Sequence, residues 1–272
     1  MKLSMPHSPF GLFLAAVLAL LSPLAGHAQG MRPATPLVAA KPAHFTLDKD
    51  EEKDFSISLS PGAYYILWDL HRPDDVASNI QATSDLLKTN GAIVQTDLLY
   101  ANEIGKTARV GKKFVVAKQL AARIRVKAAH VPMEFWMTVV PLAKLAFVPF
   151  GFPNGDLKPL GIGQANGKGG TLGIRDFAYH SIKLAPGKYD VSLYLKQPDD
   201  ISSNLQGSLD EMDAVGVPVE PRWELTVNQI GKDGRVEKRL LLLKPQMLIL
   251  RVTNENNSRQ TEYTVDIEKA TD

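Results

Sequence analysis

Apolar and polar residues alternate along several short segments of this 272-residue chain. The run YYILWDL, residues 64–70, places on one face the side chains of Tyr64, Ile66, Trp68 and Leu70. The run YDVSLYL, residues 189–195, repeats the pattern, with polar residues on its other face. A period of two residues is typical of a β-strand with one buried face. No segment after residue 28 has a convincing helical period, so the pattern predicts an all-β fold.

One segment of the chain occurs twice. RPDDVASNIQ begins at Arg72, and QPDDISSNLQ begins at Gln197, 125 residues later. SISLSPGAY matches SIKLAPGKY at the same offset, and after one inserted residue IGK at Ile104 matches IGK at Ile230. A repeated unit of roughly 100 residues is too long for a solenoid repeat and indicates a duplicated domain. We predict copies at residues 42–142 and 160–272.

Each copy has the features of a sandwich of two sheets. Short alternating strands are separated by turn residues, and Asn90-Gly91 between apolar flanks is a strong hairpin signal. Such a unit favours a β-sandwich. The sequence thus predicts two tandem jelly-roll or immunoglobulin-like β-sandwich domains that arose by internal duplication. Residues 143–159 between them are rich in proline, glycine and aromatic residues, and we expect an apolar linker.

A strand-opening motif appears in both copies. It reads Pro61-Gly62-Ala63-Tyr64 in the first copy and Pro186-Gly187-Lys188-Tyr189 in the second, and each copy closes on a strand such as YTVDI. With the glycine hairpin, these features resemble bacterial pre-peptidase C-terminal domains. The resemblance implies a jelly-roll-like sandwich of the kind that is appended to exported enzymes and often has a binding role.

The N-terminus has the physical character of an export signal. Lys2 precedes an almost unbroken apolar run at residues 10–21, and small residues around Gly26 and Ala28 suit a cleavage site. We predict a signal peptide at 1–28, an N-terminal extension at 29–41, and a periplasmic or secreted protein without a membrane span. The chain has no cysteine, so its stability must come from buried cores.

Charge and motifs argue against several functions. The 31 basic and 29 acidic residues nearly balance, which gives no sign of a nucleic-acid partner. IGKT at Ile104 lacks the earlier glycine of a phosphate loop, since Tyr100 stands there, and Asn166 interrupts a dinucleotide fingerprint. The histidines after residue 28 lack ligand spacing. We therefore expect no enzyme activity and no cofactor.

The repeated segment at Arg72 and Gln197 has two interpretations. It could supply oxygen ligands to calcium in each copy, from Asp74, Asp75 and Asn79 and from Asp199, Asp200 and Asn204. Alternatively, an aspartate after proline starts a tight turn by accepting backbone hydrogen bonds. We favour the turn, because two carboxylates and one amide are too few ligands for calcium.

A basic stripe also has two interpretations. Arg123, Arg125 and Lys127 occupy one face of a predicted strand. They either pair with acidic neighbours at the surface or bind an anionic ligand. Because Arg125 matches Arg251 in the second copy, we favour the structural role.

The two copies differ on one outward face. Tyr65 and Leu67 stand where the second copy has Asp190 and Ser192. At an offset of 126, Trp136 and Val140 stand where the second copy has Glu262 and Asp266. An apolar patch of this kind is usually covered. We expect its cover to be the second copy, the linker residues Phe147, Phe150 and Phe152, or another protein.

These observations predict a non-enzymatic periplasmic binding protein that acts through protein–protein contacts in the cell envelope. Inhibitors, immunity proteins against a secreted toxin and accessory envelope subunits belong to this class. The alternative is a carbohydrate or cell-wall binding module, for which Trp136 and Tyr65 would form the exposed aromatic platform.

Overall fold

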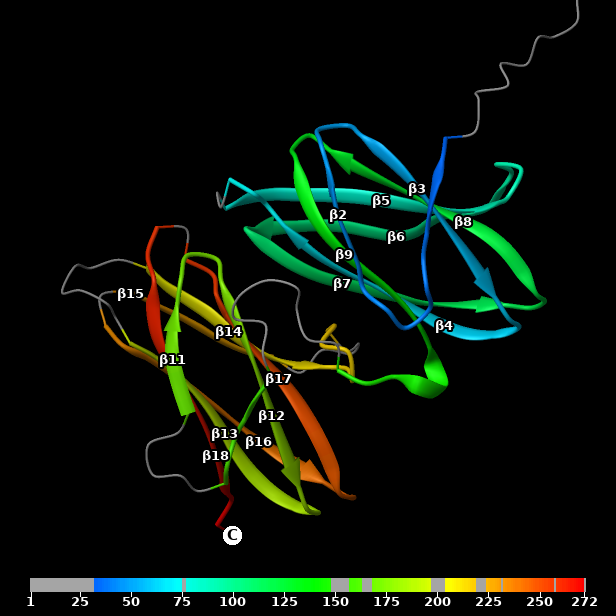
Figure 1. The fold of residues 1–272 in the computed structure, drawn as a ribbon. Coiled ribbons are helices and arrows are strands. Elements are labelled where there is room, and N and C mark those ends of the chain that lie inside the picture. Colours follow the sequence, from blue (N-terminus) through cyan, green and yellow to red (C-terminus); the bar gives the residue numbers. More distant parts are fainter. Residues whose placement is uncertain are drawn as a thin grey trace, which may run out of the picture. The chain divides into compact units, whose positions relative to one another are not determined.

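The computed structural model describes the chain from residue 32 onwards, in the ranges 32–74, 77–147, 157–162, 168–196, 204–218, 224–230, 232–256 and 258–271. It is built almost wholly of β-strands (Figure 1). The helical structure among these residues is a 3₁₀ turn at Leu142–Lys144. No helix in the described ranges is long and apolar enough to cross a membrane.

The first sandwich consists of nine described strands in two sheets. Their bounds are β1 Ala34–Pro36, β2 Ala43–Leu47, β3 Glu52–Leu59, β4 Gly62–His71, β5 Ser78–Lys88, β6 Ile93–Gly105, β7 Thr107–Val116, β8 Leu120–Ala129 and β9 Met133–Pro141. One sheet has the order β1-β3-β8-β5-β6 and the other the order β2-β9-β4-β7. All pairs are antiparallel except β1 with β3.

The second sandwich repeats this arrangement. Its described strands are β10 Leu157–Pro159, β11 Lys168–Leu172, β12 Phe177–Leu184, β13 Gly187–Lys196, β14 Asn204–Met212, β15 Glu224–Ile230, β16 Gly234–Leu242, β17 Gln246–Asn254 and β18 Thr261–Lys269. The sheet orders are β10-β12-β17-β14-β15 and β11-β18-β13-β16, the same as in the first sandwich with each label raised by nine. The predicted fold class, two tandem β-sandwiches of one topology, is confirmed.

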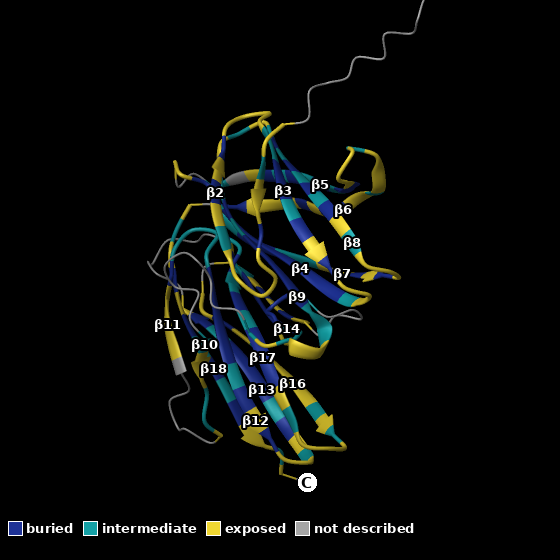
Figure 2. Ribbon diagram, turned by 45° about the vertical axis from the view of Figure 1, so that its right-hand side comes forward, coloured by how far each residue is buried: buried dark blue, intermediate teal, exposed yellow. Residues whose placement is uncertain are grey.

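The residues between the sheets explain why both copies fold alike. Residues 64–70 of β4 are all buried, because both faces of this strand are covered, whereas buried and partly exposed residues alternate over most of β13. The inward-facing residues form a separate apolar core in each sandwich (Figure 2). The repeated Pro-Gly-x-Tyr motif closes the turn before each of these strands. The Tyr64 hydroxyl donates a hydrogen bond to the Ser60 carbonyl at 2.9 Å, and the Tyr189 hydroxyl donates to Ala185 at 3.0 Å.

The sandwiches begin earlier than the sequence suggested. Strand β1 lies within the predicted N-terminal extension and pairs with β3, and β10 lies within the predicted linker and pairs with β12. Three-residue edge strands are too short to show an alternating pattern, which is why the sequence did not indicate them. The predicted signal peptide lies outside the described residues.

The register of the last strand corrects the sequence alignment. His44 pairs with Trp136, and the matching Gly169 pairs with Thr264. Tyr65 pairs with Val140, and the matching Asp190 pairs with Glu268. The true offset in this strand is therefore 128. The predicted matches of Trp136 with Glu262 and of Val140 with Asp266 were wrong by two residues. A shift of two keeps each side chain on its face, so the contrast between the faces survives.

Candidate functional site

The predicted apolar patch lies on the outer face of the sheet β2-β9-β4-β7. Tyr65 pairs with Val140, Leu67 with Thr138, and Asp69 with Trp136. The side chains of Tyr65, Leu67 and Val140 are buried. Trp136 is half-buried and stacks on His44, with ring centroids 4.6 Å apart. We call this surface the first outer face.

The second sandwich covers part of the first outer face. The turn after β14, residues 213–217, brings Val215 and Val217 into one apolar cluster with Tyr65 and Leu67. Leu142 and Leu145 pack against the same cluster. Of the covers that the sequence left open, the structure places the second copy on Tyr65 and Leu67.

The described linker aromatic, Phe147, has a different position from the one predicted. Phe147 packs against Tyr179 of β12, with centroids 5.7 Å apart. The Arg109 guanidinium lies 5.4 Å from the Phe147 ring centroid, within the range of a cation–π interaction. Phe147 therefore bridges the two sandwiches beside the patch. Phe150 and Phe152 lie outside the described residues.

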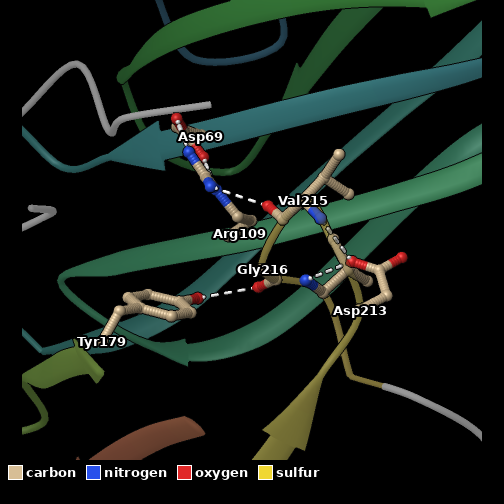
Figure 3. A network of polar contacts seen from close by, with 7 residues as sticks. Asp69, Arg109, Tyr179, Asp213, Val215 and Gly216 are labelled. Carbon is tan, nitrogen blue, oxygen red and sulfur yellow. Dashed lines mark hydrogen bonds and ion pairs between the residues drawn. The ribbon is translucent and has the colours of Figure 1, made fainter. Parts of the chain in front are cut away.

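A buried ion pair fixes the turn to the first outer face (Figure 3). Arg109 donates from Nε to Oδ1 of Asp69 at 2.5 Å and from Nη2 to Oδ2 at 2.7 Å. Its Nη1 donates to the Val215 carbonyl oxygen at 2.8 Å. The side chains are 0% and 3% exposed for Arg109 and Asp69. A buried arginine with this many acceptors joins the sandwiches by charge-assisted hydrogen bonds.

The turn itself is shaped by its own polar groups. The Asp213 carboxylate accepts hydrogen bonds at 3.0 Å from the backbone N–H groups of Val215 and Val217, and the buried Tyr179 hydroxyl donates to the Gly216 carbonyl at 2.9 Å (Figure 3). Burial and the neighbouring Asp213 carboxylate raise the pKa of Tyr65. Burial also raises the pKa of Tyr179. Both phenols therefore stay protonated at neutral pH.

Val215→Asp should loosen this contact. The change removes a buried valine, which contributes about 1.5–3 kcal/mol, and brings a carboxylate into an apolar cluster. We expect a lower midpoint in urea unfolding and faster limited proteolysis between the sandwiches. Ala214→Asp is the matched control, because Ala214 is the exposed neighbour in the same turn. Equal effects of the two changes would contradict the docking role of Val215.

The equivalent face of the second sandwich, on the sheet β11-β18-β13-β16, is polar and hollowed. A hollow of about 310 Å³ is lined by Gly169, Gly170, Thr171, Tyr194, Lys196, Glu262, Tyr263 and Thr264. Lys196 Nζ lies 3.1 Å from Glu262 Oε2, and the Tyr194 hydroxyl donates to the Asp233 carboxylate. We call this surface the second outer face.

The candidate calcium residues are only partly described. The Asp74 carboxylate accepts hydrogen bonds from Arg72, including one of 3.0 Å from Nε, so an arginine engages the group that was predicted to shape the turn. Asn79 and Asn204 are exposed. Asp75, Asp199 and Asp200 lie outside the described residues. Within the described ranges, no group of three or more His, Asp or Glu side chains could hold a metal ion.

The basic stripe is paired, as predicted. Arg123 and Arg125 lie 3.3 Å and 2.9 Å from the buried carboxylate of Asp54. Lys127 lies 3.9 Å from Glu52. The structural interpretation of the stripe is thus confirmed for the two arginines.

Sequence reasoning missed the Asp69–Arg109 pair and the hollow. One signal for the docking turn was available: Val215 and Val217 stand where the first copy has Asn90 and Ala92. Two valines in a hairpin turn indicate a covered turn. The signal for the hollow was hidden by the misaligned last strand, which concealed that Gly169 and Thr264 replace His44 and Trp136.

Comparisons with known proteins identify no family, and the structural similarities are low. No family model and no curated protein matches the chain. Among solved structures, the tandem CBM22-1–CBM22-2 domain of Paenibacillus barcinonensis Xyn10C is similar, with 12% identity, 79% of this chain and 82% of that chain covered, and a TM-score of 0.25. The PBSX exported protein XepA is similar with 9% identity, 87% and 89% covered, and a TM-score of 0.25.

Proposed function

We propose that this chain is an exported, non-enzymatic binding protein whose second sandwich presents the binding surface. One observation carries the proposal: the two copies use the same sheet face differently. Tyr65 and Leu67 of the first outer face are covered by the 213–217 turn. The second outer face holds a hollow with exposed charged groups. A duplicated domain that keeps its fold while one face becomes a hollow is consistent with a scaffold and a binding unit.

The binding surface of this proposal differs from the site that the sequence predicted. Tyr65 is 4% exposed and Trp136 is stacked on His44, so these two residues do not form a free aromatic platform. A ligand of the envelope would instead contact Tyr194, Lys196 and Glu262. Lys196 and Glu262 pair with each other, and Tyr194 is held by Asp233. In this proposal these side chains serve binding and not catalysis.

A protein partner is the second candidate, and another surface favours it. Leu241, Leu243 and Met247 around the β16–β17 turn are 64%, 86% and 52% exposed. Exposed apolar side chains close together in the chain are a feature of protein contact sites. An inhibitor, an immunity protein or an accessory envelope subunit would use such a surface.

Capture from a cell-envelope fraction tests the proposal. Immobilised protein is compared with the Tyr194→Ala and Leu243→Ser variants, and bound polysaccharide and bound protein are measured separately. We expect Tyr194→Ala to lose the bound ligand and Leu243→Ser to retain it. Loss of the bound ligand only in Leu243→Ser would place the binding site at the β16–β17 turn instead of the hollow. Binding that survives both changes, or no binding by the wild type, would contradict the proposal.

A further inference from the structure

We propose that the hollow on the second outer face binds a neutral saccharide. This inference rests on the proposed function and names the ligand class of the same surface. Its basis is what the hollow replaces, which groups line it, and how their charges balance.

The hollow lies where the first sandwich has two stacked rings. His44 and Trp136 pair across β2 and β9 and stack at 4.6 Å. The corrected register puts Gly169 and Thr264 at these positions. The second sandwich therefore lacks both rings at the matching position of its outer face. The volume of about 310 Å³ is at the small end of the roughly 300–1,000 Å³ of ligand pockets, which suits a small ligand segment.

The backbone keeps the hollow open. A Cβ atom at Gly169 would lie 1.9 Å from the Tyr263 carbonyl oxygen and 3.0 Å from Thr264 Oγ1, so β11 approaches β18 as only glycine allows. Beneath the hollow, the buried Tyr263 ring is fixed by a 2.9 Å hydrogen bond between its hydroxyl and His180. The β18 backbone that lines the hollow is thus anchored to the core beneath it through a held ring, which is a preorganised arrangement.

The lining groups form two rows across three strands. Gly169, Thr264 and Tyr194 lie side by side in one row. Thr171, Glu262 and Lys196 lie side by side in the next. The hollow therefore offers one aromatic side chain, two threonine hydroxyls, a carboxylate acceptor and an ammonium donor within a small area.

These lining groups fit a neutral sugar better than a charged ligand. The Lys196–Glu262 pair at 3.1 Å has no net charge, and Asp233 holds the Tyr194 hydroxyl. The charges of the lining residues Lys196 and Glu262 cancel, so the hollow offers a phosphate or carboxylate ligand no net positive charge to attract it. A sugar presents C–H groups that pack on an aromatic ring and hydroxyls that both donate and accept, as the neighbouring groups require.

Isothermal titration calorimetry with defined probes tests this inference. The neutral probes are oligosaccharides of glucose, xylose and N-acetylglucosamine; an oligosaccharide of galacturonic acid and inorganic phosphate are the anionic contrasts. We expect binding of at least one neutral probe and none of the anionic ones. Tyr194→Ala should weaken it roughly tenfold or more. Thr264→Trp should abolish it by restoring a ring to the hollow.

Tyr100→Ala is the matched control, since Tyr100 is a 51% exposed tyrosine on β6 of the first sandwich. It should leave binding unchanged, and thermal unfolding verifies that every variant is folded. Binding of only the anionic probes, no binding of any probe, or neutral-sugar binding that survives both Tyr194→Ala and Thr264→Trp would overturn the inference. If no sugar binds but Tyr194→Ala still loses its ligand in the envelope capture, the ligand class fails and the proposed function stands.

Discussion

Arg109→Met should lower the free energy of unfolding by about 3–5 kcal/mol, because it leaves a buried carboxylate without its cation. Asp69 is 3% exposed, and Arg109 supplies two hydrogen bonds to it. The same change removes the hydrogen bond from Arg109 to the Val215 carbonyl, so the 213–217 turn should detach from the first outer face. Urea unfolding measures the loss of stability, and limited proteolysis measures the exposure of the turn.

Two further variants separate the causes. In Arg239→Met the lost pair is also bidentate, with distances of 2.8 and 3.0 Å to Asp190, but Arg239 is 56% exposed. Its loss should have little effect, because solvent screens such a pair. The double variant Asp69→Leu with Arg109→Met should regain much of the stability, since no charge is then left buried. A single Arg109→Met change without a stability loss would refute the role of the pair.

Gly216→Ala should also be strongly destabilising. Gly216 has φ +82°, where a side chain is strained by about 1–2 kcal/mol. Its Cβ would lie 3.0 Å from the Phe147 ring, 3.2 Å from Arg109 Nη1 and 3.2 Å from the Tyr179 ring. Overpacking adds about 1–3 kcal/mol. The total loss in the free energy of unfolding should reach about 2–5 kcal/mol, as measured by urea unfolding.

The duplication supplies the control for this variant. Gly91 occupies the same turn of the first copy with φ +84°, and a Cβ there would meet nothing within 4 Å. Gly91→Ala should therefore show the backbone strain alone. The difference between the two variants measures how tightly the second copy's turn is packed against its surroundings. Identical losses would mean that the contacts around Gly216 add nothing to its conformational strain.

The two turns show how far sequence reasoning reaches. Asn90-Gly91 predicted a hairpin, and Gly91 and Gly216 do share one backbone conformation. The two valines of the second turn indicate that it is covered, but the chain pattern could not show which surface buries Val215 and Val217. Turn shape depends on local dihedral preferences, which sequence reveals. The burial of a turn depends on what lies across from it in space.

The sequence by itself determined the all-β class, the duplication, the faces on which the residues of β4, β9, β13 and β18 lie, and the contrast between the two outer faces. These features follow from a period of two residues and from a repeated pattern, and both are local. They survived even the two-residue error in the last strand, because such a shift does not change the face.

Only the tertiary structure decided which surface is covered and which is open. It brought Val215 to Arg109, which is 106 positions away in the chain. Its register also showed that Gly169 and Thr264 occupy the positions of the stacked pair His44 and Trp136. It also showed that an aspartate and an arginine on neighbouring strands are buried under a turn of the other copy. Contacts between distant segments depend on register and packing across sheets, and no local pattern in the chain encodes them.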